Sequence, residues 1–413
     1  MLNRTLLTAA SILLLSLPVQ AKEKLMILSW GDVIWQHRGE GTAQLDTPEK
    51  VVEAARIWKD RGVDRVLFRA DDFRVLLFHQ IKPSYRNAYI QEWLKTTKQA
   101  WEQRLLEVAV QAIHDQGMKV DMWITIFDEG CPEHVLYSDS DFFSWQSNFT
   151  RENPQFLSAD RSLTANQRKY HWGVMEYAYP EVREYMLRVI RAFADPLDFD
   201  GVFLSVRTHS PPAEHADQYG YNEPVVKEYQ RRYGRNILQA SFDLEKWREL
   251  RGEYLTRFLV EVKEHLKMKG QTLSIGVAQG DYIGPPFGNM KLQWRRWISE
   301  GIIDSLVVGH ITNERARYPN RTQRAMGYIQ NQEEDMGLPP IEDAVRQSYG
   351  PLSKRSGAGL YLAPRGFRMS FRHPAHGRGS QTPELRKSLV AAFEKEPAVT
   401  GIVYSYGEIM KDR

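Results

Sequence analysis

Short apolar runs alternate with longer amphipathic segments along almost the whole chain, and this alternation constrains the fold more than any other feature. The pattern is typical of βαβ units, in which helices join parallel strands. Eight runs have the length of strands, and eight such units close into a (β/α)8 TIM barrel, with a doubly wound open sheet as the alternative. The predicted strands are 25–30, 65–69, 119–127, 201–207, 273–278, 305–308, 359–362 and 401–404.

The segments between these runs carry helix signals. Thr47 and Thr382 are each followed by a proline and a glutamate, so each supplies an N-cap hydroxyl ahead of a proline at the first helical position. Gly62 and Gly117 stand where two helices have to end before the next strand. We therefore expect helices to begin after the two threonines and to end at the two glycines.

The chain is longer than its barrel requires. A bare barrel needs about 250 residues, whereas this sequence has 413. Loops after the strands of a barrel gather at its C-terminal rim, where catalytic residues are found. No linker, low-complexity tract or repeat divides residues 22–413, which predicts a single catalytic domain. The surplus is expected as insertions after strands 2, 3, 4 and 6, at 70–88, 128–179, 209–243 and 310–356.

The first 21 residues have the features of a secretory signal peptide. Arg4 precedes an apolar run from Leu6 to Leu17, and a small-residue cleavage site ends at Ala21. The run is shorter than the roughly 20 apolar residues of a membrane span, and no later stretch reaches that length. Cys131 is the only cysteine, so an intramolecular disulfide is impossible. We expect an exported, soluble protein without a membrane span, in the periplasm or outside the cell.

Charge and aromatic content narrow the class of partner. A net charge of +3, with acids and bases interspersed, gives no electrostatic footprint for nucleic acid. The 11 Trp, 19 Tyr and 17 Phe exceed what a core alone usually requires, and planar rings stack on sugar faces. No His-x-His, His-Glu-x-x-His or clustered Asp/His spacing is present, so neither a metal site nor another cofactor is implied. These features favour a carbohydrate substrate.

Three segments resemble a known family. Residues 199–207 read Phe-Asp-Gly-Val-Phe-Leu-Ser-Val-Arg, residues 178–185 read Ala-Tyr-Pro-Glu-Val-Arg-Glu-Tyr, and residues 294–308 place Trp, Gly and Asp ahead of a strand. Together they resemble the bacterial family-10-like glycosyl hydrolases, barrel proteins to which activity on polysaccharides is ascribed. The resemblance spans residues 24–410 and implies a barrel with glycoside hydrolase activity. The family motif often carries an acid where this chain has Ser205, so a strand-four carboxylate is not carried over.

Acids at the strand exits are the candidates for catalysis. Glycoside hydrolysis requires two carboxyl groups beside one bond, about 5 Å apart for retention or about 6.5–9.5 Å apart for inversion. One would be a protonated acid and the other a nucleophile or base. Asp128 follows strand three and is the first candidate, Asp281 follows strand five, and Glu408 follows strand eight. The competing roles are a turn at Asp128, a loop contact at Asp281 and a helix cap at Glu408.

Other residues at the strand exits and in the long loops are candidates for substrate binding. Aromatic rings would stack on sugars, and charged or amide groups would bind hydroxyls or carboxylates. A satellite hydrophobic cluster, an internal salt bridge or an ordinary hydrogen bond is the competing role for several of them. The candidates are Trp30, Asp32, Glu129, Trp145, Glu176, Arg207, His209, Tyr221, His310 and Tyr406.

Together these features predict an exported glycoside hydrolase that cleaves a polysaccharide or oligosaccharide with paired carboxylates. Two alternatives stay open. Arg207, His209 and nearby tyrosines lie in the strand-four region, where the expected acid is missing, and such a set fits a polysaccharide lyase acting on a uronate-containing glycan. A glycan-binding barrel without catalysis would keep the aromatic rim and lack the acid pair.

Overall fold

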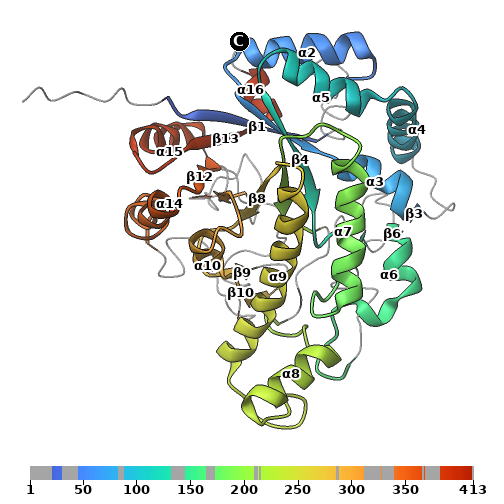
Figure 1. Cartoon of the computed structure of the whole chain (residues 1–413), viewed down its shortest axis with the longest axis vertical. Helices are drawn as coiled ribbons and strands as arrows, with labels where there is room; N and C mark the ends of the chain where they lie inside the picture. Colours follow the sequence, from blue (N-terminus) through green and yellow to red (C-terminus); the bar gives the residue numbers. More distant parts are fainter. Residues whose placement is uncertain are drawn as a thin grey trace, which may run out of the picture.

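Eight parallel strands form a closed barrel at the centre of the molecule (Figure 1). They are β1 (Glu23–Ser29), β2 (Arg65–Arg69), β4 (Lys119–Thr125), β7 (Gly201–Ser205), β8 (Thr272–Val277), β11 (Ser305–Val308), β12 (Gly359–Leu362) and β13 (Gly401–Ser405). β1 pairs with β13 on one side and with β2 on the other, which closes the ring. The predicted barrel is confirmed, and the open sheet is excluded. This computed structural model describes residues 21–29, 45–81, 88–131, 145–163, 173–208, 213, 215–284, 288–310, 327, 339–364, 367 and 382–411.

Each of the eight predicted runs contains a barrel strand, but two strands end two residues earlier than predicted. β4 ends at Thr125, and β7 ends at Ser205. The apolar run continues past each end because Ile126, Phe127 and Val206 remain buried after the chain has left the barrel. Burial therefore explains the extra apolar residues, and the backbone N–H of Ile126 still donates to the Ser205 carbonyl at 2.9 Å.

Helices surround the barrel strands, and the four predicted helix ends lie where the local signals placed them (Figure 1). The side chains of Thr47 and Thr382 accept hydrogen bonds from the first turns of α2 (Pro48–Asp60) and α15 (Pro383–Lys395). Gly62 and Gly117 adopt positive φ angles of 73° and 67°, which glycine tolerates without strain. The other helices are α3 (Asp71–Phe78), α4 (Ala88–Glu102), α5 (Leu105–Asp115), α6 (Asn148–Glu152), α7 (Pro180–Ala194), α8 (Glu223–Tyr233), α9 (Leu244–Lys267), α10 (Trp294–Ser299), α13 (Ile341–Ala344), α14 (Gly350–Ser356) and α16 (Tyr406–Lys411).

Side chains fill the barrel interior in layers. Every second residue of a strand points inward, and the middle layer is apolar. Gly276 of β8 leaves room in this layer, because a Cβ atom there would lie 2.6 Å from the rings of both Phe203 and His310. The interior is therefore a packed core rather than a pore. The buried apolar residues of this cluster are Leu25, Leu67, Trp123, Phe203, Val307, Tyr361, Ala363 and Val403.

A charged cluster lies below the apolar layer, at the N-terminal ends of the strands. Arg65 donates to Glu23 at 3.0 Å and to Asp121 at 2.7 Å, and the Tyr361 hydroxyl donates to Glu23 at 2.5 Å. Burial raises the pKa of Asp121 to about 6, although Arg65 opposes the shift. These bonds link four adjacent or facing strands at the end of the barrel opposite the predicted rim.

Two small sheets lie in the loops after the barrel strands. β3 (His79–Ile81), from the loop after β2, pairs with β6 (Trp145–Ser147), which also pairs with β5 (Gly130–Cys131). After β8, β9 (Tyr282–Gly284) and β10 (Gly288–Lys291) form an antiparallel hairpin. In the described part of the chain, no helix has both the length and the apolar character that a membrane crossing requires.

Candidate active site

Arg69, the last residue of β2, lies between two carboxylates at the C-terminal mouth of the barrel. Its Nε donates to Asp71 Oδ2 at 3.2 Å, and its Nη2 lies 3.7 Å from Asp128 Oδ2. The guanidinium carbon is 5.3 Å from the centre of the Trp123 ring, which belongs to the interior layer below. Asp128, the first catalytic candidate, is buried, with a relative exposure of 4%. The mouth thus combines a buried acid, a cation and an indole.

Asp71 was not among the sequence candidates, although it follows a barrel strand as they do. Its carboxylate accepts hydrogen bonds from the backbone N–H of Thr125 at 2.8 Å and from Arg74 Nη1 at 3.2 Å, in addition to Arg69. Asp71 begins α3, where the helix dipole also favours a negative charge. The adjacent acids Asp71 and Asp72 directly after strand two were the signal that would have identified this position.

Ser205 and His310 form the floor of the mouth. Ser205 Oγ lies 2.8 Å from His310 Nε2, and the backbone N–H of Arg207 donates to the same hydroxyl at 3.3 Å. The imidazole packs edge to face against Trp123 and Phe203, with centroid distances of 5.5 and 4.8 Å. Two predicted binding residues therefore lie at the mouth: His310 packs in the floor, and Arg207 is half-buried beside it.

Glu129 is adjacent to Asp128 in the chain but is bound elsewhere. Its carboxylate forms an ion pair with Arg74, accepts a 2.7 Å hydrogen bond from the Tyr185 hydroxyl, and lies 3.7 Å from His79 Nε2. Burial and the neighbouring Arg74 hold the pKa of His79 well below its usual value. The Glu129 side chain is fully buried, so these contacts favour a structural role over substrate binding.

The other two catalytic candidates are bound by residues of outer helices. Asp281 Oδ1 accepts hydrogen bonds from Trp294 Nε1 at 2.8 Å and from Arg295 Nη1 at 2.6 Å, both in α10. Glu408 Oε2 accepts from the backbone N–H and the hydroxyl of Ser405, at 2.5 and 2.7 Å, and Glu408 also pairs with Arg386 of α15. The first arrangement orders a loop and the second caps α16, which are the competing roles that the sequence indicated.

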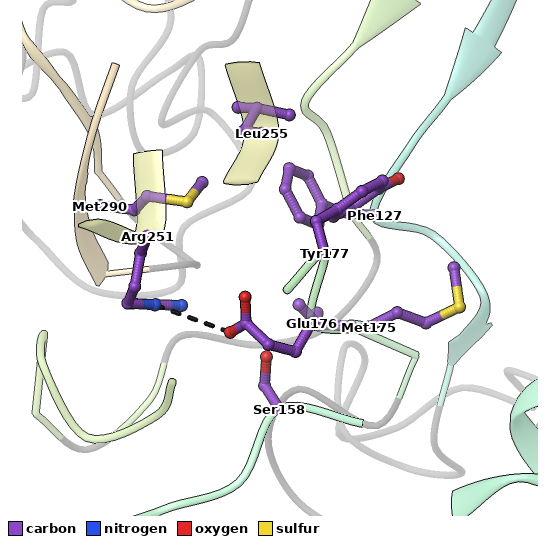
Figure 2. Close-up of a pocket in the computed structure, with 9 residues that line it drawn as sticks. Phe127, Ser158, Met175, Glu176, Tyr177, Arg251, Leu255 and Met290 are labelled. Carbon is purple, nitrogen blue, oxygen red and sulfur yellow. Dashed lines mark ion pairs between the residues drawn. The ribbon is translucent and has the colours of Figure 1, made fainter. Parts of the chain in front are cut away.

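Glu176 lines a small pocket near the exit of β4. Figure 2 shows its carboxylate facing Arg251 of α9, and Glu176 Oε2 lies 3.7 Å from Arg251 Nε. Burial raises the pKa of Glu176, with Arg251 opposing the shift. The pocket is walled by apolar side chains and by Ser158, and Phe127, one residue before Asp128, is part of that wall (Figure 2). The surroundings of Glu176 therefore favour its protonated form.

The remaining binding candidates are separated from the mouth or fall outside the described residues. Tyr221 is buried and stacks on Trp247 of α9, with ring centres 4.9 Å apart. Tyr406, the first residue of α16, packs edge to face on Trp58, and burial raises its pKa to about 12. Trp145 is part of β6, but its side chain lies outside the described residues, as do Trp30, Asp32 and His209 entirely.

Within the ranges that the structure describes, no three His, Cys, Asp or Glu side chains gather closely enough to hold a metal ion. The described polar groups of the mouth suit charge stabilisation and proton transfer. Arg69 favours the ionised form of a nearby carboxyl group. The Trp123 ring offers an apolar surface beside it, of the kind on which sugar rings stack.

The whole chain was compared with known proteins. No curated protein matches its sequence. Among solved structures, the catalytic domain of a β-amylase from Paenibacillus polymyxa has a TM-score of 0.52 at 9% identity, covering 93% of this chain and 92% of that domain. A β-galactosidase from the psychrophilic Marinomonas ef1 has a TM-score of 0.51 at 11% identity. The match covers 93% of this chain, which spans only 54% of the length of that enzyme. At such identities the likeness shows the barrel fold alone.

A family model gives the more specific result. The model described as glycosyl hydrolase-like 10 matches residues 75–336, which is more than half of the chain. The matched region contains the exits of β4, β7, β8 and β11, and with them Asp128, Ser205 and His310. It also agrees with the resemblance carried by the three sequence segments. The chain therefore belongs to the glycosyl hydrolase-like 10 family.

Proposed function

We propose that this protein is an exported glycoside hydrolase that cleaves a polysaccharide or oligosaccharide at the mouth of its barrel. The proposal depends chiefly on Asp128, a buried acid at a strand exit beside Arg69 and the Trp123 ring. Family membership and the barrel fold support a carbohydrate substrate. The long insertions expected after strands 2, 3, 4 and 6 would form the walls of the substrate cleft.

We assign different roles to two carboxyl groups. Arg69 favours an ionised Asp128, which suits a nucleophile or general base. Burial raises the pKa of Glu176, which suits a proton donor. Asp281 and Glu408, predicted as catalytic from sequence, rank behind Glu176 because each already binds residues of outer helices.

Four single variants test this assignment. Asp128→Asn and Glu176→Gln are expected to lower kcat by roughly 10²–10⁴-fold, since each removes a group that transfers a proton or attacks the sugar. Asp281→Asn and Glu408→Gln serve as matched controls and should retain most of the turnover. The substrate is first found by screening the purified protein against a panel of polysaccharides for new reducing ends. Full turnover by Asp128→Asn would show that the assignment is wrong.

A lyase is the second candidate function, because Arg207 and His310 lie at the mouth while Ser205 replaces the family acid. An arginine would neutralise a uronate carboxylate, and a histidine would remove the adjacent proton. A lyase creates an unsaturated product that absorbs ultraviolet light, whereas a hydrolase does not. Absorbance read in parallel with the reducing-end assay distinguishes the two. Glycan binding without either signal would favour a non-catalytic barrel.

Export is proposed from the features of residues 1–21. The first described strand, β1, begins at Glu23, directly after the expected cleavage site and Lys22. The Lys22 ammonium donates to the carbonyl oxygens of Glu396 and Val399 at 2.8 and 2.5 Å, near the start of β13. Cleavage after Ala21 would therefore leave all eight barrel strands intact. Mass spectrometry of the exported protein should find Lys22 at its N-terminus, and a retained leader would contradict the proposal.

A further inference from the structure

We infer that Asp71 is a positioning residue: by holding the Arg69 guanidinium, it limits how strongly Arg69 contacts Asp128. The inference rests on the proposed function in one respect, namely that Asp128 takes part in the chemistry. Asp71 itself is assigned no contact with the substrate. It would act only through Arg69.

Asp71 is fixed by hydrogen bonds from three sides. It accepts from the backbone of Thr125, from Arg74 and from Arg69, at 2.8, 3.2 and 3.2 Å. Arg74 also donates to the carbonyl of Thr125 at 3.0 Å. Thr125 is the last residue of β4, three positions before Asp128. The strand that carries Asp128 therefore also fixes the position of Asp71.

Arg69 is shared unequally between the two carboxylates. Its Nε forms a hydrogen bond with Asp71, whereas its Nη2 lies 3.7 Å from Asp128, which is beyond hydrogen-bond distance. The guanidinium is a planar, rigid group, so a bond at Nε also fixes the direction of Nη2. Trp123 lies under the guanidinium and restricts its tilt. This geometry keeps Arg69 close to Asp128 without a direct hydrogen bond.

Two other basic side chains lie near Asp71 and Asp128, and their charges bear on the contact with Arg69. Arg74 is bound by Asp71 and Glu129, so its charge is largely offset. His79 of β3 also interacts with Asp128, but burial and Arg74 lower the pKa of His79 and keep the ring neutral. Two carboxylates therefore compete for one guanidinium. Removing the charge of Asp71 should strengthen the contact between Arg69 and Asp128.

Carboxyl titration by NMR tests the inference without any substrate. The side-chain carbons of the ¹³C-labelled protein (residues 22–413) are followed against pH, and the Asp128 signal is assigned by its loss in Asp128→Asn. In Asp71→Asn, the midpoint of the Asp128 titration should fall by on the order of one pH unit, because a nearby negative charge is lost and Arg69 is no longer shared. Asp72→Asn, the adjacent acid, is the matched control and should produce a smaller fall.

Arg69→Gln provides a second test in the opposite direction, and it applies even if Asp71→Asn fails to fold. Without the guanidinium, Asp128 faces Asp71 with no intervening cation, so its midpoint should rise. An unchanged midpoint in either folded variant would overturn the inference. So would equal shifts in Asp71→Asn and Asp72→Asn.

Kinetics distinguish a failure of the inference from a failure of the proposed function. On an identified substrate, Asp71→Asn should move the acidic limb of the kcat/KM profile to lower pH and lower kcat by roughly 10- to 100-fold, with little change in KM. A purely structural role would lower activity without moving that limb, and this result would contradict the inference. If the NMR midpoint moves and no glycan is cleaved, the inference stands and the proposed function fails.

Discussion

The two ends of strand β2 place an arginine between two carboxylates in different ways. At the closed end, Arg65 donates to Glu23 and Asp121 at 3.0 and 2.7 Å. At the mouth, four residues later, Arg69 donates to Asp71 at 3.2 Å but only approaches Asp128, at 3.7 Å. Both arginine side chains have the same exposed fraction, 12%.

The difference lies in how closely each arginine approaches its two acids. Arg65 bonds both of its acids, and Tyr361 completes the cluster through Glu23. Such a closed cluster mainly fixes the strand ends. Arg69 leaves one carboxylate without a direct bond from its guanidinium, and that carboxylate is at the end of the barrel where active sites occur. The same residue type on one strand thus serves stability at one end and, we propose, chemistry at the other.

The largest expected effect is on stability at the closed end. Arg65→Met leaves the buried Asp121 and the half-buried Glu23 without their cation and should lower the free energy of unfolding by about 3–5 kcal/mol. Arg69→Met should cost less, because Arg69 lies farther from its two acids, at 3.2 Å from Asp71 and 3.7 Å from Asp128. Urea unfolding of both variants at pH 7 measures the difference. Equal losses would show that the two ends are energetically alike.

The next effect is a pH dependence that belongs to Asp121. Its pKa in the folded protein is about 6, above the usual 3.8, so the folded state binds the extra proton between these values. Stability from this proton is fully present below about pH 4 and is lost as the pH rises through 6, by about 3 kcal/mol in total. Asp121→Asn has no such proton to lose. From pH 4 to 7 the wild type should therefore lose unfolding free energy that the variant keeps, so the variant becomes more stable relative to the wild type. A difference in unfolding free energy that stays constant over this range would refute the prediction.

A smaller effect is expected in the floor of the mouth. Gly276→Ala places a Cβ atom 2.6 Å from the rings of His310 and Phe203, so those rings have to move. Overpacking of this kind should destabilise the protein by about 1–3 kcal/mol and weaken the bond between His310 and Ser205. Ser205→Ala is the control, because it removes the same bond without adding volume. Thermal unfolding measures both, and a neutral Gly276→Ala would mean that the floor is loosely packed.

The smallest effect is expected at Tyr361. Tyr361→Phe removes the hydrogen bond to Glu23 and keeps the ring in the interior layer. The expected loss is about 1.5 kcal/mol, as for a hydrogen bond to a charged group. The variant should leave turnover at the mouth unchanged, and a change in kcat would indicate that the two ends are coupled. Unfolding and activity are measured on the same preparation.

The barrel could be predicted from sequence because its signals are local. Strand length, helix period, threonine caps and terminal glycines each act within a few residues, and β2, β11 and β12 begin and end at the predicted residues. Asp128 could be proposed as a candidate for a similar reason, since the end of a strand is visible in sequence. Asp71 also follows a barrel strand, but it was not among the sequence candidates.

The contacts of the site could not be predicted, since they depend on which strands become neighbours. Ser205 and His310 are 105 positions apart, and they meet because Gly276, on the strand between theirs, leaves space for the imidazole. Asp128 and Glu129 look alike in sequence, yet one contacts Arg69 and the other contacts Arg74. Arg251, the partner of Glu176, lies in helix α9. The sequence candidates were sought at the strand exits and in the loops, so this residue was not among them.

The small sheet of β3, β6 and β5 joins two rim loops through backbone hydrogen bonds, although β3 follows barrel strand β2 and the other two follow β4. A one-residue insertion in either loop would shift this pairing and turn the following side chains to the opposite face. The two loops should therefore change in length together as the family diverges, or not at all. An engineer who transplants one of them to alter specificity would have to move the other with it.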